Sequence, residues 1–212
     1  MFVAAAAHAQ SVKPIALMGI PTEIAPVEAR VEGASTTRIQ GFVFTTGSIE
    51  GVRVVVARSG VGKVNAAIVA TLLLERFTPS TLIFTGTAGA IDKNLVPADV
   101  VIGIGVGYHD FGSITERGFR RSATRDPNSG QVDPTFFPAD PQLLAAARRA
   151  SKTVQLSQGP QASSKAPQVR EGLIVTGDAF VANADNRKDL AKELNAAAVE
   201  MEGAAAAQVA AR

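Results

Sequence analysis

The sequence predicts an α/β protein, a three-layer α/β/α domain with a mixed, largely parallel central sheet. Three observations support this class. Short apolar runs of strand length alternate along the chain with longer segments in which apolar residues recur every three or four positions. Turns rich in glycine and proline separate these segments. One turn, at residues 47–51, joins two strand-like runs directly, which is typical of an antiparallel hairpin and makes the sheet mixed.

The expected strands are apolar runs bounded by glycine, proline or polar residues. In chain order they are 15–20, which Pro21 closes with a turn, 41–46 and 52–57 on either side of the hairpin turn, 81–85, 99–104, 172–176 and 196–200. The expected helices are 60–77, 142–151, 187–194 and an Ala-rich helix from Gly203 onward. In the first helix, apolar residues from Ala66 to Leu74 share one face, and Pro79 follows the helix end. Residues 22–40 are expected to be a polar connection, and 111–169 a long, mainly polar insertion.

The two ends of the chain raise expectations of their own. Residues 1–13 are expected to be a leader or disordered terminus, because Ala7-His8-Ala9 fits the small-x-small pattern of a signal-peptidase site. A signal-peptide remnant would make the protein periplasmic or secreted, and without one it would be cytoplasmic. Residues 14–212 are expected to form the α/β domain. The last helix reaches Arg212 with no cap and no following strand, so a C-terminal part of the domain is expected to be missing.

Composition argues against several classes of function. Lys and Arg number 21 against 19 Asp and Glu, and this net charge of +2 is too small for a nucleic-acid surface. The chain has no cysteine and two histidines, so no metal site is expected. No apolar run approaches the ~20 residues that a membrane-spanning helix needs. We therefore expect a small-molecule partner, and no nucleic acid, membrane, metal or redox cofactor.

Polar and glycine-rich residues follow four of the expected strands, at 22–23, 86–89, 177–180 and 200–202. In open α/β sheets ligands bind beyond the carboxyl ends of the strands, so these segments are expected to share one rim. Carboxylates, a hydroxyl and an aromatic ring there would suit a sugar and a flat ring, and a carboxylate can deprotonate a water. Each segment alone is also compatible with a helix start, a plain turn or a rim charge. His109 is compatible with a base or with a structural role.

Taken together and in this order, six segments resemble the nucleoside phosphorylase and nucleosidase superfamily, and most closely its 5′-methylthioadenosine/S-adenosylhomocysteine nucleosidases. They are ALMGIPTE (16–23), SGVGKVNA (59–66), TGTAGA (85–90), YHD (108–110), GLIVTGDAF (172–180) and VEME (199–202). The resemblance extends over residues 15–212. It implies the nucleoside phosphorylase-like fold.

The resemblance also implies an activity, an N-glycosyl hydrolase that releases adenine from 5′-methylthioadenosine/S-adenosylhomocysteine-like purine nucleosides without metal or cofactor. It implies two catalytic residues, Glu23 as the carboxylate that activates the attacking water and Glu202 as the acid that binds the ribose hydroxyls. It implies that Thr87 is a hydroxyl residue near the water and that Phe180 stacks on the purine. The residues it implies for substrate binding are Thr87, Ala88, Gly89, Phe180, Val181, Glu200 and Met201. It further implies a homodimer, with residues 106–111 near the interface.

Two alternatives stay open. One is a phosphate-dependent purine nucleoside phosphorylase. Phosphorylases of this superfamily hold phosphate with arginines in the first glycine loop and just before the Gly-Ser/Thr turn, whereas this sequence has Glu23 and Phe84 there, which favours water. The other is a catalytically inactive nucleoside-binding protein of the same fold. The family's general acid is an aspartate on a strand after the VEME helix, and the chain stops before it, which leaves turnover by this chain open.

Overall fold

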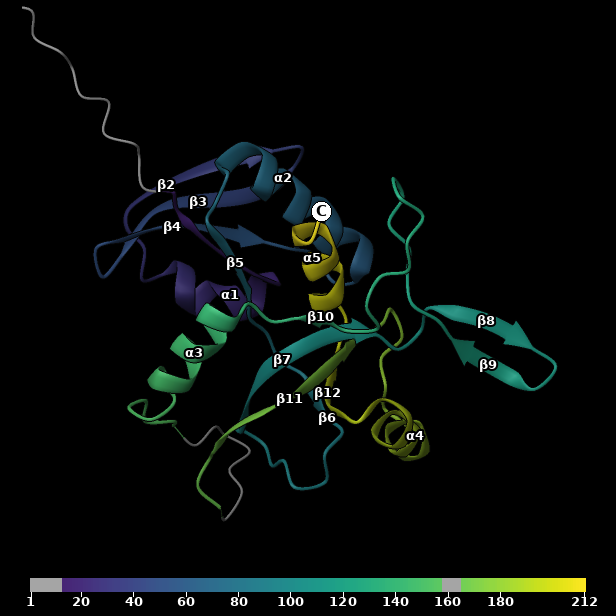
Figure 1. The fold of residues 1–212 in the computed structure, drawn as a ribbon. Helices are drawn as coiled ribbons and strands as arrows, with labels where there is room; N and C mark the ends of the chain where they lie inside the picture. Colours follow the sequence, from purple (N-terminus) through teal and green to yellow (C-terminus); the bar gives the residue numbers. More distant parts are fainter. Residues whose placement is uncertain (1–12, 158–164) are drawn as a thin grey trace, which may run out of the picture.

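The computed structural model describes residues 13–157 and 165–212. The expected leader, 1–13, lies outside the described residues except for Lys13. The described chain forms two five-stranded sheets and a separate two-stranded hairpin, with helices packed on the sheets (Figure 1). The expected three-layer α/β class with mixed strands is confirmed.

The first sheet has the strand order β2-β3-β4-β1-β5. Strand β1 is parallel to β4 and β5, and β3 is antiparallel to β2 and β4. The strands are β1 (Ile15–Gly19), β2 (Glu32–Ile39), β3 (Phe42–Ile49), β4 (Val52–Arg58) and β5 (Thr81–Phe84). The helices that cover this sheet are α1 (Pro21–Glu28) and α2 (Lys63–Phe77).

Strand β4 shows how one sheet separates two helical layers. Its side chains alternate between the two faces. Val55 and Ala57 lie in the core cluster that includes α2, and Val54 and Val56 lie in a second cluster with Ile24 of α1. All five are buried. The continuous apolar run in β4 is therefore the signature of a strand covered on both sides.

The second sheet has the strand order β10-β7-β11-β12-β6, with β11 parallel to both β7 and β12. The strands are β6 (Gly89–Ala90), β7 (Val100–Tyr108), β10 (Phe137–Pro138), β11 (Val169–Thr176) and β12 (Ala196–Glu200). The helices that accompany them are α3 (Pro141–Ala150), α4 (Ala184–Leu194) and α5 (Gly203–Ala210). Helix α4 is anchored by Leu190, which packs in a buried cluster with Val175 and Val199.

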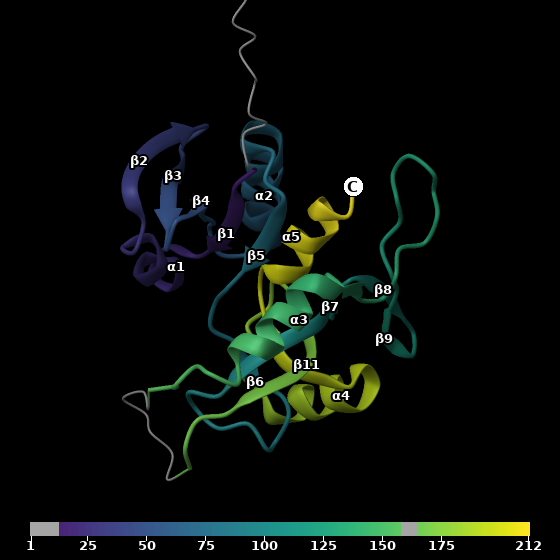
Figure 2. The ribbon, with the colours of Figure 1, turned by 60° about the vertical axis from the view of Figure 1, so that its left-hand side comes forward.

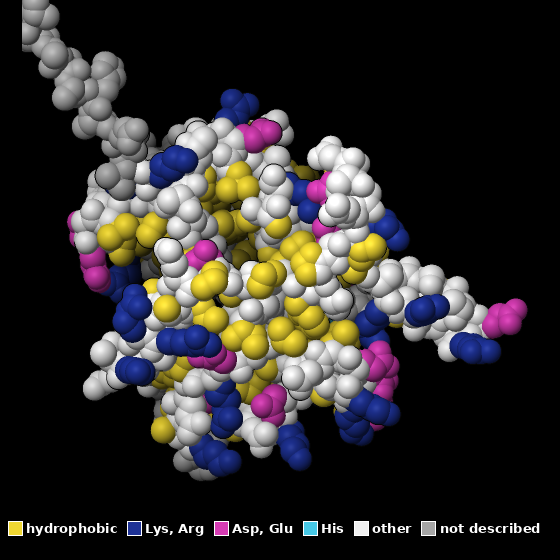
Figure 3. Space-filling model, viewed as in Figure 1, with side chains coloured by type: hydrophobic (Ala, Val, Ile, Leu, Met, Phe, Trp, Pro, Cys, Tyr) yellow, Lys and Arg dark blue, Asp and Glu magenta, His cyan; other side chains and the backbone are white. Residues whose placement is uncertain are grey.

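Helix α5 connects the two halves of the fold. It contacts α2 and β5 on the side of the first sheet, and β7, β10 and β11 on the side of the second (Figure 2). Its first residues, Gly203–Ala206, are buried, and their small side chains allow this close approach from both sides. Hydrophobic side chains also reach the surface around α3 and α5, where they gather on one face of the molecule (Figure 3).

Several local expectations differ from the structure. Pro21 opens helix α1 rather than a turn, because a proline at the first helical position loses no hydrogen bond. The expected polar connection 22–40 contains α1 and β2, and β2 is an edge strand whose exposed residues show no apolar alternation. The polar insertion contains strands β8 (Gly112–Thr115), β9 (Gly118–Arg121) and β10. The strands of the central layer form two hydrogen-bonded sheets instead of one.

Candidate active site at the junction of the two sheets

The candidate site lies where the carboxyl ends of the parallel strands of both sheets meet. The loops after β1, β4 and β5 come from the first sheet, and those after β7, β11 and β12 from the second. Backbone N–H groups donate to carboxylates across the junction, from Gly62 N to Glu202 Oε1 at 2.8 Å and from Lys63 N to Asp178 Oδ1 at 2.9 Å. Two of the segments that the sequence assigns to one rim, 177–180 and 200–202, are therefore both held by the loop after β4.

Glu23 stands at the first-sheet side of the junction, in the first turn of α1. Its Oε1 accepts hydrogen bonds from the Thr87 backbone N–H at 2.9 Å and from the Thr87 hydroxyl. Gly86 leaves room for this carboxylate, since a Cβ atom there would overlap Glu23 Oε2 and displace it. The Glu23 side chain is only partly buried, so water can reach the carboxylate that Thr87 holds in place.

Glu202 stands on the second-sheet side and is buried, with 6% of its surface exposed. Its Oε1 accepts the Gly62 N–H, and its Oε2 accepts the N–H of Met201 at 3.2 Å. Gly62 has a φ of 92°, in the left-handed region that favours glycine, which explains the second glycine of the SGVGK segment. A carboxylate has about four lone-pair positions, so Glu202 keeps acceptor capacity for hydroxyl groups.

Glu200 has a different environment from Glu202. Its Oε2 accepts the backbone N–H groups of Glu202 at 2.8 Å and Gly203 at 2.6 Å, and its Oε1 accepts the Thr176 hydroxyl. Thr176 Oγ1 in turn accepts the N–H of Ala204 at 2.9 Å. Burial raises the pKa of Glu200, against the lowering effect of these hydrogen bonds. The chain itself thus uses both oxygens of Glu200, which holds the start of α5 and with it Met201 and Glu202.

The remaining expected contacts surround these acids. Phe180 is 84% exposed, so its ring is free to stack on a flat ligand. Val181 packs against the buried cluster of the second sheet, which fixes the turn that carries Phe180. Gly89 pairs with Val199, and so the backbone of Ala88 and Gly89 lies next to the start of the VEME segment.

Two groups of this region were not among the expected site residues, although both lie within the matching segments. Lys63 forms an ion pair with Asp110, with Nζ–Oδ1 at 2.7 Å. No sequence period marks this pair, because it depends on contacts between the two sheets. His109 is buried against Gly177, and burial lowers its pKa below the usual value. Its Nε2 has no hydrogen-bond partner among the described residues, so no neighbouring group orients His109 as a general base.

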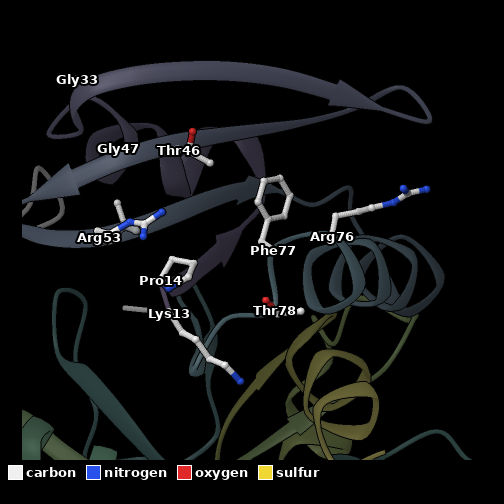
Figure 4. A pocket seen from close by; sticks show the side chains of 10 residues that line it. Lys13, Pro14, Gly33, Thr46, Gly47, Arg53, Arg76, Phe77 and Thr78 are labelled. Carbon is white, nitrogen blue, oxygen red and sulfur yellow. The ribbon is translucent and has the colours of Figure 1, made fainter. Parts of the chain in front are cut away.

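A separate cavity of about 430 Å³ lies at the opposite end of the first sheet (Figure 4). It is lined by Pro14, which precedes β1, by Arg53 and Val54 near the start of β4, and by Phe77 at the end of α2. The charged ends of Lys13 and Arg76 point away from each other in Figure 4 rather than toward a shared centre. The cavity is therefore distinct from the candidate active site.

The described residues contain neither a cluster of metal-binding side chains nor a membrane-spanning helix. Among residues 13–157 and 165–212, no three or more His, Asp or Glu side chains gather as a metal ion would need. No helix in this part of the chain is long and apolar enough to cross a membrane.

Comparisons with known proteins agree with the fold. The curated nucleosidase of Psychromonas ingrahamii, named 5′-methylthioadenosine/S-adenosylhomocysteine nucleosidase, is 38% identical over 191 residues, which are 88% of this chain and 74% of the relative. A protein of the same name from Mycobacterium bovis is 33% identical over 199 residues, 91% of this chain and 77% of the relative.

Solved structures give the same result. The nucleosidase of Neisseria meningitidis in complex with methylthio-immucillin-A superposes with a TM-score of 0.77 at 34% identity, covering 94% of this chain and 80% of that one. Futalosine hydrolase of Helicobacter pylori superposes with a TM-score of 0.76 at 28% identity, covering 94% and 79%. The family model described as the phosphorylase superfamily matches residues 14–212. The chain therefore belongs to the phosphorylase superfamily.

Proposed function

We propose that the protein hydrolyses the N-glycosidic bond of 5′-methylthioadenosine/S-adenosylhomocysteine-like purine nucleosides and releases adenine. The observation that carries the proposal is the Glu23 carboxylate, held by the N–H and hydroxyl of Thr87 on the rim that also presents Glu202 and Phe180. The names of the curated relatives support the same reaction class.

The proposed roles follow from the chemistry of the reaction. Cleavage of an N-glycosidic bond builds positive charge on the sugar, which nearby carboxylates stabilise. Glu23 takes a proton from the attacking water, and the departing purine gains a proton at N7 as its bond to the sugar breaks. Glu202 accepts hydrogen bonds from the ribose hydroxyls. Phe180 stacks on the purine, whose edge meets the backbone of Val181. Met201 lies against the sugar, while Thr87, Ala88 and Gly89 line the side nearest the water.

Glu200 has a supporting role in this proposal, because both of its carboxylate oxygens are engaged by Thr176 and the backbone. It sets the place of Met201 and Glu202 rather than contacting the nucleoside. This departs from the direct substrate contact that the resemblance implies for Glu200.

Water is the proposed nucleophile rather than phosphate. A phosphate dianion needs cations, usually arginines, at its site. The loop 19–23 has an acid and no arginine, and Phe84 precedes Thr85. A carboxylate beside a phosphate in a partly buried site would repel it by roughly several kcal/mol.

The test is release of free adenine from 5′-methylthioadenosine with and without phosphate. Glu23→Gln is expected to abolish release and to leave adenine binding intact, whereas Glu75→Gln, an exposed acid on α2, is the matched control and keeps both. Release that requires phosphate and yields a sugar phosphate would replace the proposal with a phosphorylase. Bound nucleoside without product from the wild-type chain would replace it with a binding protein.

The 5′ substituent of the nucleoside needs a separate measurement. The Neisseria meningitidis nucleosidase and the Helicobacter pylori futalosine hydrolase match the fold almost equally, at TM-scores of 0.77 and 0.76. We propose the methylthio or homocysteine substituent, because the curated relatives at 33–38% identity carry that name. A higher kcat/KM for futalosine than for 5′-methylthioadenosine would contradict this choice.

We also propose a homodimer. Val64 and Ile68 lie four residues apart on α2 and are exposed, as is Phe111 after β7. The Lys63–Asp110 ion pair brings the start of α2 next to the end of β7, so these apolar side chains belong to one region. Sedimentation should show a dimer for the wild type and a monomer after Val64→Glu with Ile68→Glu. The control Val154→Glu changes an exposed valine elsewhere, and equal masses for all three proteins would contradict the assignment.

A further inference from the structure

Lys63 is the centre of a polar cluster that joins three loops of the candidate site. Its Nζ lies 2.7 Å and 2.9 Å from the two carboxylate oxygens of Asp110, and 3.5 Å from Asp178 Oδ2. Its backbone N–H donates to Asp178 Oδ1 at 2.9 Å. The N–H of Asp178 donates to Asp110 Oδ2 at 2.8 Å, which closes the cluster.

The cluster connects the two sheets. Lys63 is the first residue of α2, on the side of the first sheet, whereas Asp110 follows β7 and Asp178 follows β11 of the second sheet. The side chains of Lys63 and Asp110 are 22% and 23% exposed, so the pair is largely shielded from water. An ion pair shielded in this way is screened less by salt than a surface pair.

The two backbone N–H groups at the start of α2 hold two different carboxylates. Gly62 N donates to Glu202, and Lys63 N donates to Asp178. The first amides of a helix have no partner within the helix, and the positive end of the helix dipole favours negative charge there. The proposed ribose acid, Glu202, and the turn that carries Phe180 are therefore held by adjacent amides.

The charges in the cluster favour the ion pair between Lys63 and Asp110. Burial acts to raise the pKa of Asp110, but hydrogen bonds from Lys63 and from the Asp178 N–H, together with the Lys63 charge, bring it below the usual value. Asp110 is thus an anion at neutral pH and stays paired with the ammonium group. Lys63 also lies over the Tyr108 ring, 5.5 Å from its centroid.

We propose that Lys63 is a positioning residue that sets the place of the purine-stacking turn, 177–181, relative to the ribose acid Glu202. This inference rests on the proposed nucleosidase function. Asp178 is two residues before Phe180, and its backbone N–H and carboxylate are both held by the cluster. Loss of the Lys63 ammonium removes the cation from Asp110 and Asp178 at once, which frees the turn while Phe180 and Glu202 remain in the chain.

The experiment compares Lys63→Met, Lys63→Arg and the control Lys188→Met. Lys188 pairs with Asp185 at 2.8 Å on the exposed surface of α4, so the control also removes one Lys–Asp pair. Urea titrations first establish conditions under which all of these proteins are folded. Under those conditions we measure adenine affinity, kcat and KM for 5′-methylthioadenosine, and hydrogen exchange of the turn 177–181 without ligand. Asp110→Asn provides the same test if Lys63→Met does not fold.

For Lys63→Met we expect faster exchange of the turn and an adenine Kd and KM higher by on the order of 10-fold, as for loss of one hydrogen bond to a charged group. Lys63→Arg should restore both values to within about 3-fold of the wild type, because a guanidinium also binds a carboxylate with two hydrogen bonds. Lys188→Met should leave exchange and binding unchanged.

Unchanged exchange of the turn in folded Lys63→Met would overturn the role of the cluster itself. Faster exchange with wild-type adenine affinity and KM would overturn positioning of the purine, while the nucleosidase function would still stand. Failure of the wild-type protein to bind adenine and nucleoside would instead refute the proposed function, and the positioning role with it.

Discussion

Replacement of Glu200 by alanine tests how the start of α5 is held. Glu200 and Thr176 together accept three backbone N–H groups, those of Glu202, Gly203 and Ala204. These amides have no acceptor within the helix. Glu200→Ala removes the acceptor of the first two and leaves the Thr176 hydroxyl without the carboxylate it donates to.

The expected loss can be worked from these contacts. A buried N–H without an acceptor costs about 1–3 kcal/mol, so two of them cost about 2–6 kcal/mol. Removing the carboxylate also removes the cost of its own desolvation, which offsets part of this loss. We therefore expect the free energy of unfolding to fall by about 3 kcal/mol, which corresponds to about 6–12 °C in Tm for a domain of this size.

Urea unfolding followed by circular dichroism measures this difference, provided that the slope m is the same in all proteins. Glu200→Gln keeps one carbonyl oxygen as acceptor and should lose only about 1–2 kcal/mol. The exposed control Glu75→Gln should stay within about 0.5 kcal/mol of the wild type.

A Glu200→Ala protein as stable as the wild type would refute the reasoning, since the helix amides would then be satisfied by other groups. Wild-type stability of Glu200→Gln combined with lost nucleoside affinity would point instead to a direct substrate contact, the role that the resemblance implies.

Three further predictions concern groups near the site. Burial lowers the pKa of His109, so on acidification the unfolded chain takes up a proton before the folded chain does. The contribution of His109 to the free energy of unfolding should be full above about pH 6.5 and fall below it by up to about 1.4 kcal/mol per pH unit. Urea midpoints measured against pH should lack this fall in His109→Asn. Burial, followed by Asp110 and other acids, raises the pKa of the single tyrosine, Tyr108, to about 12; ultraviolet titration should show this midpoint, and Asp110→Asn should lower it. Phe180→Ala should weaken adenine binding by about 1–3 kcal/mol and leave the free energy of unfolding unchanged, because the ring is exposed. Wild-type adenine affinity of Phe180→Ala in calorimetry would contradict this prediction.

Regular elements with a strong apolar pattern could be predicted from the sequence. Strands β1, β4, β5 and β11 and helix α2 lie close to their expected positions, because a run of apolar residues or an apolar stripe leaves a local signature. Strand β2 could not be predicted, since its residues are exposed at a sheet edge. The division of the strands into two sheets also has no local signature, because pairing depends on distant segments.

One part of the candidate site could likewise be predicted from the sequence, and another part could not. The common rim could be predicted, since the carboxyl ends of parallel strands meet at one edge. The difference between Glu200 and Glu202 could not, because two acids two residues apart at a helix start diverge only through their tertiary partners, Thr176 for one and Gly62 for the other. The role of Lys63 could not be predicted for the same reason, since its partners follow strands of the other sheet.

The Ala-rich start of α5 acts as a spacer between the two halves of the site. Ala204, Ala205 and Ala206 are buried where the helix touches elements of both sheets, so the width of a methyl group sets how closely the halves approach. A larger side chain there would act as a wedge, because a close-packed interior has no room for added carbons. The geometry of the candidate site thus depends on the volume of residues that lie outside it. Larger side chains along the start of α5 would move the two halves of the site apart.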